Sequence, residues 1–282
     1  MRVISTAVVR RAAVGVSVLL LAGCAATPVP GTPGPTGAAP AAALKSGPVT
    51  VIALGDSLTA GDGDDTGKGF VGRLTEAIAA RPGREGSTLT NLGQSGWDST
   101  QMVNGYDGGP QAQLPQAVAK ARAAAPGAVL ATVLIGSNDL WYVYQNGAVE
   151  PTPRAEENAM VAAYRANLER TLTELQAAGA VVVVGLPDDQ SARPIAADMG
   201  RLNQQLSAVT AEEVSKMSAL SDVLDRTAAE VAAAHGAPTV DTNDPFWADP
   251  ARMADDGIHP NAAGYTALAE LWTGGVAPLL GP

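Results

Sequence analysis

Two short glycine-rich segments of this sequence carry residues suited to nucleophilic chemistry. Ser57 follows Gly55 and Asp56 directly after an apolar run, and His259 lies three residues after Asp256. A serine hydroxyl becomes a nucleophile when a neighbouring base takes its proton, and histidine has a suitable pKa for that task. A carboxylate three residues before the histidine can fold back onto the imidazole, fix its tautomer and stabilise its charged form. The residues therefore predict a nucleophilic serine, a histidine base and an aspartate that orients the base.

Two other residues leave the roles of acid and base open to alternatives. Asp255 directly precedes Asp256 and is a second candidate for the orienting acid, although we prefer Asp256. His235 is the only other histidine, and it lies in the last turn of an expected helix, where an imidazole can meet unpaired carbonyl groups. This position favours a structural role for His235. Without Ser57, the segment around His259 would be interpreted as a solvated acidic loop.

A serine nucleophile also needs hydrogen-bond donors for the oxyanion that develops during attack. Three candidates follow the ends of expected strands: the backbone N–H groups of Ser57 and Gly96, and the side-chain amide of Asn138. An asparagine at such a place also commonly satisfies its own backbone in a turn. The three donors are expected to lie together only if their strands end at the same edge of one sheet.

The apolar patterning supplies that sheet. Strands are expected at 49–54, 87–92, 129–135, 181–186 and 238–240, with the first delivering Ser57 into a flexible loop. Helices are expected around 70–78, 111–125, 155–178 and 196–234, the last with one break between Met217 and Asp225, and a final helix carries Tyr265. Strands that alternate with helices predict a three-layer α/β/α sandwich around a mostly parallel five-stranded sheet.

Other polar and aromatic residues lie close to these motifs. The acidic segment 61–67 lacks the spacing of a calcium loop and is expected to be solvated and mobile. Trp97, Trp141, Tyr142 and Tyr144 follow two of the motifs and are candidates either for a substrate pocket or for the core. Trp272, on the final helix, is expected in the core.

The first 47 residues are expected to lie outside the folded domain. Residues 1–23 combine arginines, a short apolar core and a Leu-Ala-Gly ending before Cys24, which is typical of a secretory signal. That ending resembles a bacterial lipobox, which implies acylation of Cys24, the only cysteine in the chain, and a lipid anchor on the outer face of the cell membrane. An ordinary signal with an incidental cysteine is the alternative to a lipobox, and release to the extracellular space is the alternative to a membrane location. The Arg10-Arg11 pair is a hint of twin-arginine export.

Composition limits the partners of this chain. Residues 24–47 are rich in proline, glycine and alanine and are expected to form a tether, which leaves 48–282 as one domain. The net charge of −10 would become about −13 after loss of the three signal arginines. Such a negative chain argues against nucleic acid as a partner and against binding to anionic lipid through a basic patch.

Four motifs together resemble the blocks of the GDSL, or SGNH, hydrolase family. They are Gly55-Asp56-Ser57-Leu58, Asn91 to Gly96, Gly136-Ser137-Asn138-Asp139 and Asp256-Gly257-Ile258-His259, and they occur in the order of the family's blocks. The resemblance covers 49–271. It implies a flavodoxin-like sheet, Ser57 as nucleophile, His259 as base, Asp256 as its orienting acid, and Ser57, Gly96 and Asn138 as the oxyanion hole. Trp97, where the family commonly has a small or polar residue, and the long helical region 196–234, a possible lid or groove, depart from the pattern.

The resemblance implies an esterase that needs no metal or organic cofactor. We expect hydrolysis of short- to medium-chain carboxylic esters through an acyl-enzyme by a monomer, with a small-molecule, lipid or glycan ester as substrate and Trp97, Trp141 and Tyr142 near the pocket. A carbohydrate O-deacetylase and a thioesterase or lysophospholipase are alternatives within the same fold. A non-catalytic lipoprotein that binds glycans or lipids is the alternative from another class.

Overall fold

The computed structural model describes residues 43–106, 111–145, 154–206 and 209–281. The expected signal at 1–23, Cys24 and nearly all of the tether lie outside these residues, so the predictions about export and acylation stay predictions. Within the described residues, no helix is both long enough and apolar enough to cross a bilayer.

Five parallel strands form one sheet at the centre of the domain. The strands are β1 (Val49–Gly55), β2 (Thr88–Asn91), β3 (Ala128–Leu134), β4 (Val181–Leu186) and β5 (Thr239–Asp241), and their spatial order is β2-β1-β3-β4-β5. β1 and β3 are paired along their whole length, from Val49 opposite Ala128 to Gly55 opposite Leu134. The expected α/β/α sandwich with a flavodoxin-like sheet is confirmed.

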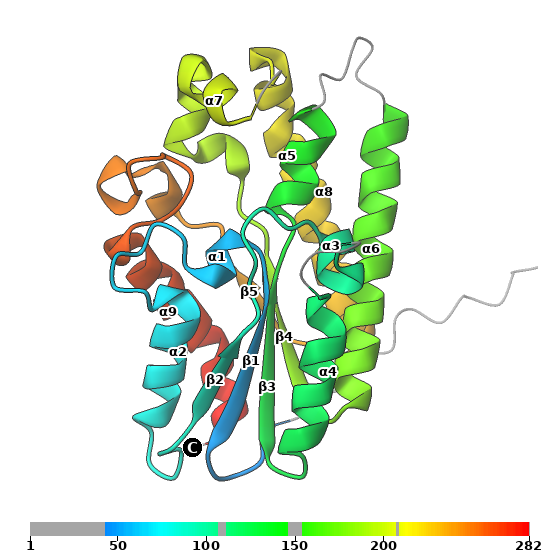
Figure 1. Cartoon of the computed structure of the whole chain (residues 1–282), viewed down its shortest axis with the longest axis vertical. Coiled ribbons are helices and arrows are strands. Elements are labelled where there is room, and N and C mark those ends of the chain that lie inside the picture. The colour runs from blue at the N-terminus through cyan, green and yellow to red at the C-terminus, as the bar shows by residue number, and fades with distance from the viewer. Residues whose placement is uncertain (1–42, 107–110, 146–153, 207–208, 282) are drawn as a thin grey trace, which may run out of the picture. The chain divides into compact units, whose positions relative to one another are not determined.

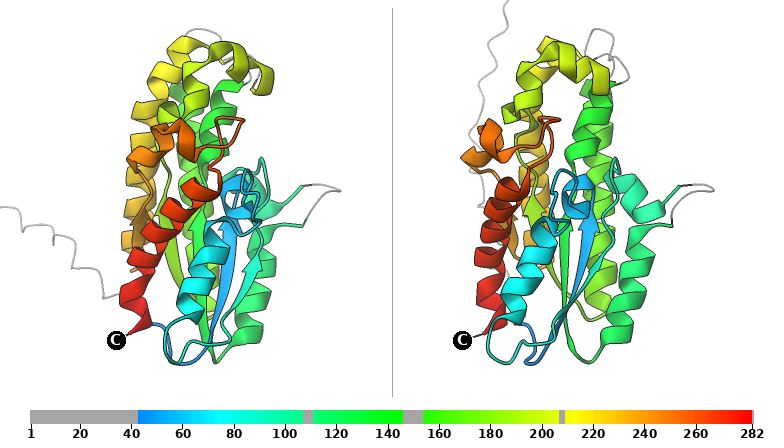
Figure 2. Two further views of the ribbon diagram at one scale, coloured as in Figure 1. Left: turned by 90° about the vertical axis from the view of Figure 1, so that its left-hand side faces the viewer. Right: turned by 60° about the vertical axis from the view of Figure 1, so that its left-hand side comes forward.

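Helices cover both faces of this sheet (Figures 1 and 2). Helices α2 (Gly69–Ala79) and α9 (Ala262–Val276) cover one face, and α4 (Gln113–Ala124), α6 (Arg154–Ala177) and α8 (Ala211–Ala234) cover the other. Shorter helices lie in the connections: α1 (Ser57–Ala60), α3 (Ser99–Asn104), α5 (Ser137–Gln145) and α7 (Met199–Gln205). The connections also contain 3₁₀ turns at 190–192, 194–197, 245–248 and 250–252, and a further 3₁₀ turn at 277–280 follows α9.

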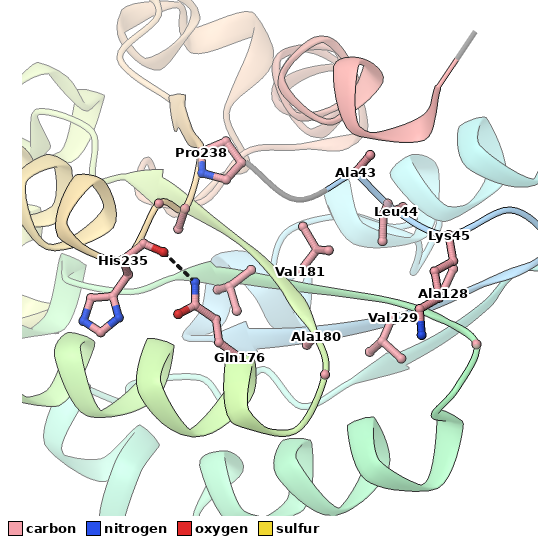
Figure 3. A pocket seen from close by; sticks show the side chains of 15 residues that line it. Ala43, Leu44, Lys45, Ala128, Val129, Gln176, Ala180, Val181, His235 and Pro238 are labelled. Atoms are coloured by element: carbon pink, nitrogen blue, oxygen red, sulfur yellow. Dashed lines mark hydrogen bonds between the residues drawn. The ribbon is translucent and has the colours of Figure 1, made fainter. Parts of the chain in front are cut away.

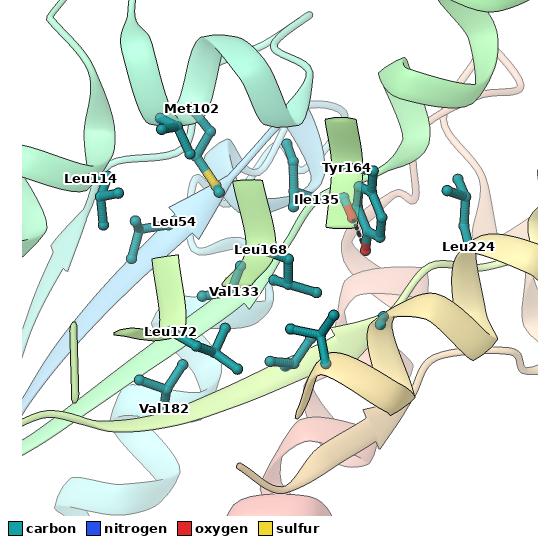
Figure 4. Packing of buried hydrophobic residues seen from close by; sticks show 14 of the residues in the cluster. Leu54, Met102, Leu114, Val133, Ile135, Tyr164, Leu168, Leu172, Val182 and Leu224 are labelled. Carbon is teal, nitrogen blue, oxygen red and sulfur yellow. Dashed lines mark hydrogen bonds between the residues drawn. The ribbon is translucent and has the colours of Figure 1, made fainter. Parts of the chain in front are cut away.

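The alternation of side chains along the strands divides the core into two clusters. Ile52 and Leu54 of β1 face one cluster, while Val51 and Ala53 face the other. Figure 4 shows the first cluster, where Leu54, Val133 and Val182 of the sheet meet Leu168 and Leu172 of α6. The second cluster contains Trp272, which is fully buried and stacks on Phe70 with ring centroids 5.1 Å apart, as expected for a core residue. Each large apolar side chain buried in this way contributes about 1.5–3 kcal/mol.

Two expectations about segments between strands were wrong. The helical region 196–234 is interrupted before α8 rather than between Met217 and Asp225. α8 begins after a capping box formed by Thr210 and Glu213 and continues without a break to Ala234. α8 packs on α6 and β4, so it forms part of the outer helix layer. Among the described residues of this region, only α7 is a short separate helix, so only α7 is left as a candidate for the expected lid or groove. The acidic segment 61–67 is also not fully solvated, because Asp64 is buried and paired with Arg73.

Asp64 anchors the segment that follows α1. Its carboxylate accepts hydrogen bonds from the Arg73 guanidinium and from the backbone N–H groups of Thr66 and Gly69. Burial alone would raise the pKa of Asp64, but these bonds, led by the one from Arg73, outweigh it and hold the pKa well below its usual range. The acidic residue thus orders the loop beside the first motif.

Candidate active site

The first three motifs follow β1, β2 and β3 at the carboxyl edge of the sheet, and the fourth immediately precedes α9. Ser57 is the first residue of α1, directly after β1, so it lies at a helix N-terminus rather than in the expected flexible loop (Figure 1). Asp56 caps α1 by accepting a hydrogen bond from the N–H of Leu58. Gly55 has a φ of +155° and no room for a side chain, because an added Cβ would lie 2.1 Å from the carbonyl oxygen of Leu134. A glycine is therefore required where β1 turns into α1.

Ser57, His259 and Asp256 form a continuous chain of hydrogen bonds. The Oγ of Ser57 lies 2.8 Å from Nε2 of His259, and Nδ1 of His259 lies 2.6 Å from Oδ2 of Asp256. With the proton on Nδ1, the ring donates to Asp256 and its Nε2 accepts from the serine hydroxyl. This arrangement can move a proton from Ser57 to His259 while the carboxylate stabilises the resulting imidazolium.

Asp256 is held in the ionised form needed for this task. Its second oxygen, Oδ1, accepts hydrogen bonds from the backbone N–H groups of Ile258 at 2.8 Å and His259 at 2.9 Å. Burial opposes ionisation, but the hydrogen bonds from His259 and Ile258 outweigh it and lower the pKa of Asp256 to about 2. Asp255, the alternative acid, is exposed. The structure therefore places Asp256, and not Asp255, against the imidazole.

The segment 254–260, which we call the histidine loop, is tightly folded. Met253 and Pro260 form an antiparallel bridge, and the N–H of Ala254 donates to the carbonyl of His259 at 2.8 Å. The loop lies directly against the segment after Ser57: an added Cβ on Gly63 would be 2.7 Å from the Pro260 carbonyl oxygen and 3.0 Å from Cβ of His259. The imidazole is thus fixed by contact between two segments about 200 residues apart.

The three candidate oxyanion donors belong to segments that are bonded to one another. The side-chain N–H of Asn138, at the start of α5, donates to the carbonyl of Trp97 at 2.9 Å, and the Tyr142 hydroxyl donates to the carbonyl of Gly96. The N–H of Gln94 donates to Gly55, which ties the same segment to the end of β1. Among the described residues, the N–H of Gly96 and the second amide N–H of Asn138 have no hydrogen-bond acceptor. They are available to a ligand.

A buried carboxylate, that of Asp139, bonds the chain just after Gly96. Asp139 accepts hydrogen bonds from the N–H of Ser99 at 2.9 Å and from its hydroxyl at 2.5 Å. Burial raises the pKa of Asp139 to about 7, against the effect of these two bonds. Burial similarly raises the pKa of Asp56 to about 6, and Oδ2 of Asp56 has no hydrogen-bond partner among the described residues. Both acids therefore titrate near neutral pH, close to the site.

The aromatic candidates have different environments. Trp141 is buried in the core and its indole N–H donates to Gln190 at 3.1 Å. Trp97 is also buried, with its ring edge-on to Tyr106 at 5.8 Å between centroids, and Tyr144 is buried and bonded to Glu157. Of the four rings, only that of Tyr142 is partly exposed, and its hydroxyl donates to the Gly96 carbonyl. The structure therefore packs Trp141 into the core and leaves Tyr142 nearest to an open surface.

His235 lies far from this edge. It ends α8 at the amino edge of the sheet, beside a hollow of about 470 Å³ that Gln176 and Lys45 also line (Figure 3). The His235 carbonyl accepts a hydrogen bond from the Gln176 side chain at 2.9 Å. This placement agrees with a structural role. No cluster of three or more potential metal ligands occurs in the part of the chain that the structure describes.

The comparisons with known proteins identify the family. Residues 53–267 match the model of the GDSL-like lipase/acylhydrolase family. The chain belongs to this family. It is a hydrolase that acts on ester bonds. No protein of curated function matches the chain.

Solved structures share the fold of this hydrolase at low identity. A lipase/acylhydrolase from Enterococcus faecalis is 21% identical with a TM-score of 0.52, and the match covers 83% of this chain and 97% of that one. A variant of Axe2, an acetyl xylan esterase from Geobacillus stearothermophilus, is 19% identical with a TM-score of 0.54, over 83% and 96% of the two chains. LAE5, an alpha/beta hydrolase from the metagenome of Lake Arreo in Spain, is 22% identical with a TM-score of 0.52, over 83% and 97%.

Proposed function

We propose that this hydrolase is a serine esterase that cleaves carboxylic esters of short- to medium-chain acyl groups through an acyl-enzyme. The hydrogen-bond chain from Ser57 through His259 to Asp256, with separations of 2.8 and 2.6 Å, is the observation that carries the proposal. Such a chain activates a serine without a metal or an organic cofactor.

The reaction proceeds in two steps. Oγ of Ser57 attacks the ester carbonyl carbon while Nε2 of His259 takes the hydroxyl proton. The negative oxygen of the tetrahedral intermediate accepts hydrogen bonds from the N–H groups of Ser57 and Gly96 and from the Asn138 amide. The C–O bond to the alcohol then breaks, and His259 gives its proton to the leaving oxygen. Water, deprotonated by the same imidazole, attacks the acyl-serine and releases the carboxylic acid and the free serine.

The packing of the tryptophans favours the shorter acyl groups. Trp141 and Trp97 are fixed in the interior, so neither ring is free to form the wall of a long acyl channel. A carbohydrate O-deacetylase is the second candidate within this proposal, since an acetyl group needs the least pocket volume and one protein of similar fold is named as an acetyl xylan esterase. A thioesterase or lysophospholipase remains the third candidate.

Hydrolysis of p-nitrophenyl esters from acetate to palmitate tests this proposal. Residues 43–282 are purified with Ser57 intact and as Ser57→Ala, and both are treated with a fluorophosphonate probe. We expect turnover highest at the short end, covalent labelling of the wild type, and loss of both labelling and turnover by several orders of magnitude in Ser57→Ala. Equal turnover in the two proteins would refute the assignment of Ser57. No turnover and no labelling in either would favour the non-catalytic binding protein.

We also propose that the protein is exported and held at the outer face of the cell membrane by acylated Cys24. The signal-like composition of 1–23 and the Leu-Ala-Gly-Cys sequence support this proposal. Metabolic labelling with a radioactive fatty acid should label the wild type and not Cys24→Ser, and Cys24→Ser should leave the membrane fraction. Labelling of the Cys24→Ser protein would refute this proposal, because the lipid would then be attached to another residue. The monomeric state also remains a prediction.

A further inference from the structure

A fully buried ion pair lies behind the histidine loop. Arg193 and Asp188 are exposed by only 2% and 1% of their side chains. Nε of Arg193 donates to Oδ2 of Asp188 at 2.9 Å, and Nη2 donates to Oδ1 at 2.8 Å, so the pair is bidentate. Removing two charges from water costs about as much as their attraction returns, and apolar replacements are often equally stable. Stability alone is therefore a weak reason for this pair.

The third nitrogen of the guanidinium reaches the histidine loop. Nη1 of Arg193 donates to the carbonyl oxygen of Ile258 at 3.0 Å. The same peptide unit contains the N–H of His259, which donates to Asp256 at 2.9 Å. The peptide that joins Ile258 to His259 is thus held on both sides, by Asp256 through its N–H and by Arg193 through its oxygen. Rotation of this peptide would turn the imidazole away from Ser57.

A second bond from the same segment reinforces the first. The N–H of Ile195, two residues after Arg193, donates to the carbonyl oxygen of Gly257 at 3.0 Å. Two successive carbonyl groups of the histidine loop are therefore bonded to residues 193–195. The guanidinium also lies over the ring of Trp247, 4.5 Å from its centroid, which limits its orientation further.

The ion pair also connects to the helix that carries Asn138. Oδ1 of Asp188 accepts a hydrogen bond from the Gln190 amide at 2.9 Å. The oxygen of the same Gln190 amide accepts a hydrogen bond from the indole N–H of Trp141 at 3.1 Å. The amide nitrogen lies 3.4 Å from the Ser137 hydroxyl. The pair thus lies between the segment that holds the base and the helix that holds a candidate oxyanion donor.

We propose that Arg193, fixed by Asp188, is a positioning residue that sets the reach of His259 toward Ser57. This inference rests on the proposed function, since it concerns the efficiency of the same proton transfer. A misplacement of about 1 Å at reacting atoms can lower the rate about a hundredfold. Lysine is not an adequate substitute, because a single ammonium cannot replace a planar fork that bonds Asp188 and Ile258 together.

The test compares Arg193→Met and Arg193→Lys with a matched control, Arg84→Met. Arg84 is also buried, at 6% exposure, and also bonds carbonyl groups, those of Lys45, Gly47 and Leu280, which lie away from the site. For each protein, kcat and KM for p-nitrophenyl acetate are measured per serine titrated with a fluorophosphonate. The Tm and the proton resonance of the His259–Asp256 hydrogen bond are recorded as well.

We expect both Arg193 variants to lose about tenfold to a hundredfold in kcat, with KM within about threefold of the wild type and a shifted or broadened resonance. Arg84→Met should lower the Tm and keep kcat and the resonance. A kcat in Arg193→Met within twofold of that in Arg84→Met would overturn the inference.

If Arg193→Met does not fold, the double variant Asp188→Asn/Arg193→Met removes the unpaired charge. Wild-type kcat in that double variant would also overturn it. A wild type without serine-dependent turnover would instead refute the proposed function.

Discussion

The carboxylate of Asp256 makes two contributions to the base: its charge stabilises the imidazolium, and its acceptor oxygen holds the proton on Nδ1. Replacing Asp256 with asparagine removes both, and the size of the loss shows which one is larger. The amide oxygen of Asp256→Asn can still accept from the N–H groups of Ile258 and His259, as Oδ1 does now. The amide nitrogen would then face Nδ1 of His259, where Oδ2 now lies at 2.6 Å. Two donors cannot share this contact, so the imidazole must carry its proton on Nε2, which points at Ser57. In that tautomer the ring cannot take the serine proton.

The structure allows the two contributions to be compared in size. The hydrogen bond between Nδ1 of His259 and Oδ2 of Asp256, at 2.6 Å, has a charged acceptor, and such a bond contributes about 2 kcal/mol. Loss of that charge effect alone would lower kcat roughly thirtyfold. The wrong tautomer is expected to cost about 10⁴ in kcat, as it does in other serine triads. The tautomer effect should dominate.

Steady-state kinetics with p-nitrophenyl acetate at pH 7 to 9, normalised to titrated serine, measures this loss. Asp255→Asn is the matched control, because it removes the same charge from the neighbouring residue, whose side chain is exposed. We expect a loss of about 10⁴ in kcat for Asp256→Asn and less than twofold for Asp255→Asn. A loss below about thirtyfold for Asp256→Asn would refute the tautomer argument. A large loss in Asp255→Asn alone would transfer the orienting role to that residue.

Three further outcomes follow from the site. Asn138→Ala should lower kcat roughly a hundredfold or more with an unchanged circular dichroism spectrum, and an unchanged kcat would remove Asn138 from the oxyanion hole. Gly63→Ala should lower kcat while Gly67→Ala should not, because both have positive φ but only the Cβ at Gly63 meets the histidine loop; equal effects in assays of the two would contradict this contact. Asp139 has its pKa raised to about 7, so the folded state binds this proton more tightly than the unfolded state and loses about 2–3 kcal/mol of stability between pH 5 and pH 7. Urea unfolding should show a smaller loss in Asp139→Asn, and identical pH profiles would mean that Asp139 is not neutral in the folded state.

The sheet and its functional edge could be predicted because both depend on local patterns. β1 and β3 are continuous apolar runs that end at glycine-containing polar motifs, and the predicted strand boundaries lie within a few residues of those observed. The short helices could not be predicted in the same way. α3 has six residues and depends on a capping box between Asp98 and Gln101 rather than on apolar periodicity. α1, with four residues, has no periodicity to detect.

No helix was expected at the position of α5, and this explains why the sequence left two roles open for the aromatic residues. Successive residues of a helix point about 100° apart, so the first residue of the helix decides which rings face the core. With Ser137 at the start, Trp141 and Tyr144 turn inward and Tyr142 turns toward Gly96. The sequence predicted only that Asn138 follows the end of a strand, where a turn is common, and a turn has no such phase. The orientation of these rings therefore required the tertiary structure.

Arg193 was missed for a related reason, and its contacts show how the site reaches its geometry. Nothing in the sequence around Arg193 marks it, because its partners are Asp188, the distant Ile258 carbonyl and the Trp247 ring. The histidine loop is thereby bonded on one side to the segment after β4, while Gly63 fits closely against its other side. A loop held from two sides has its imidazole in place before substrate binds, so disturbance of either contact should lower kcat more than it raises KM. A parallel rise in KM would instead mean that the same contacts shape the substrate pocket.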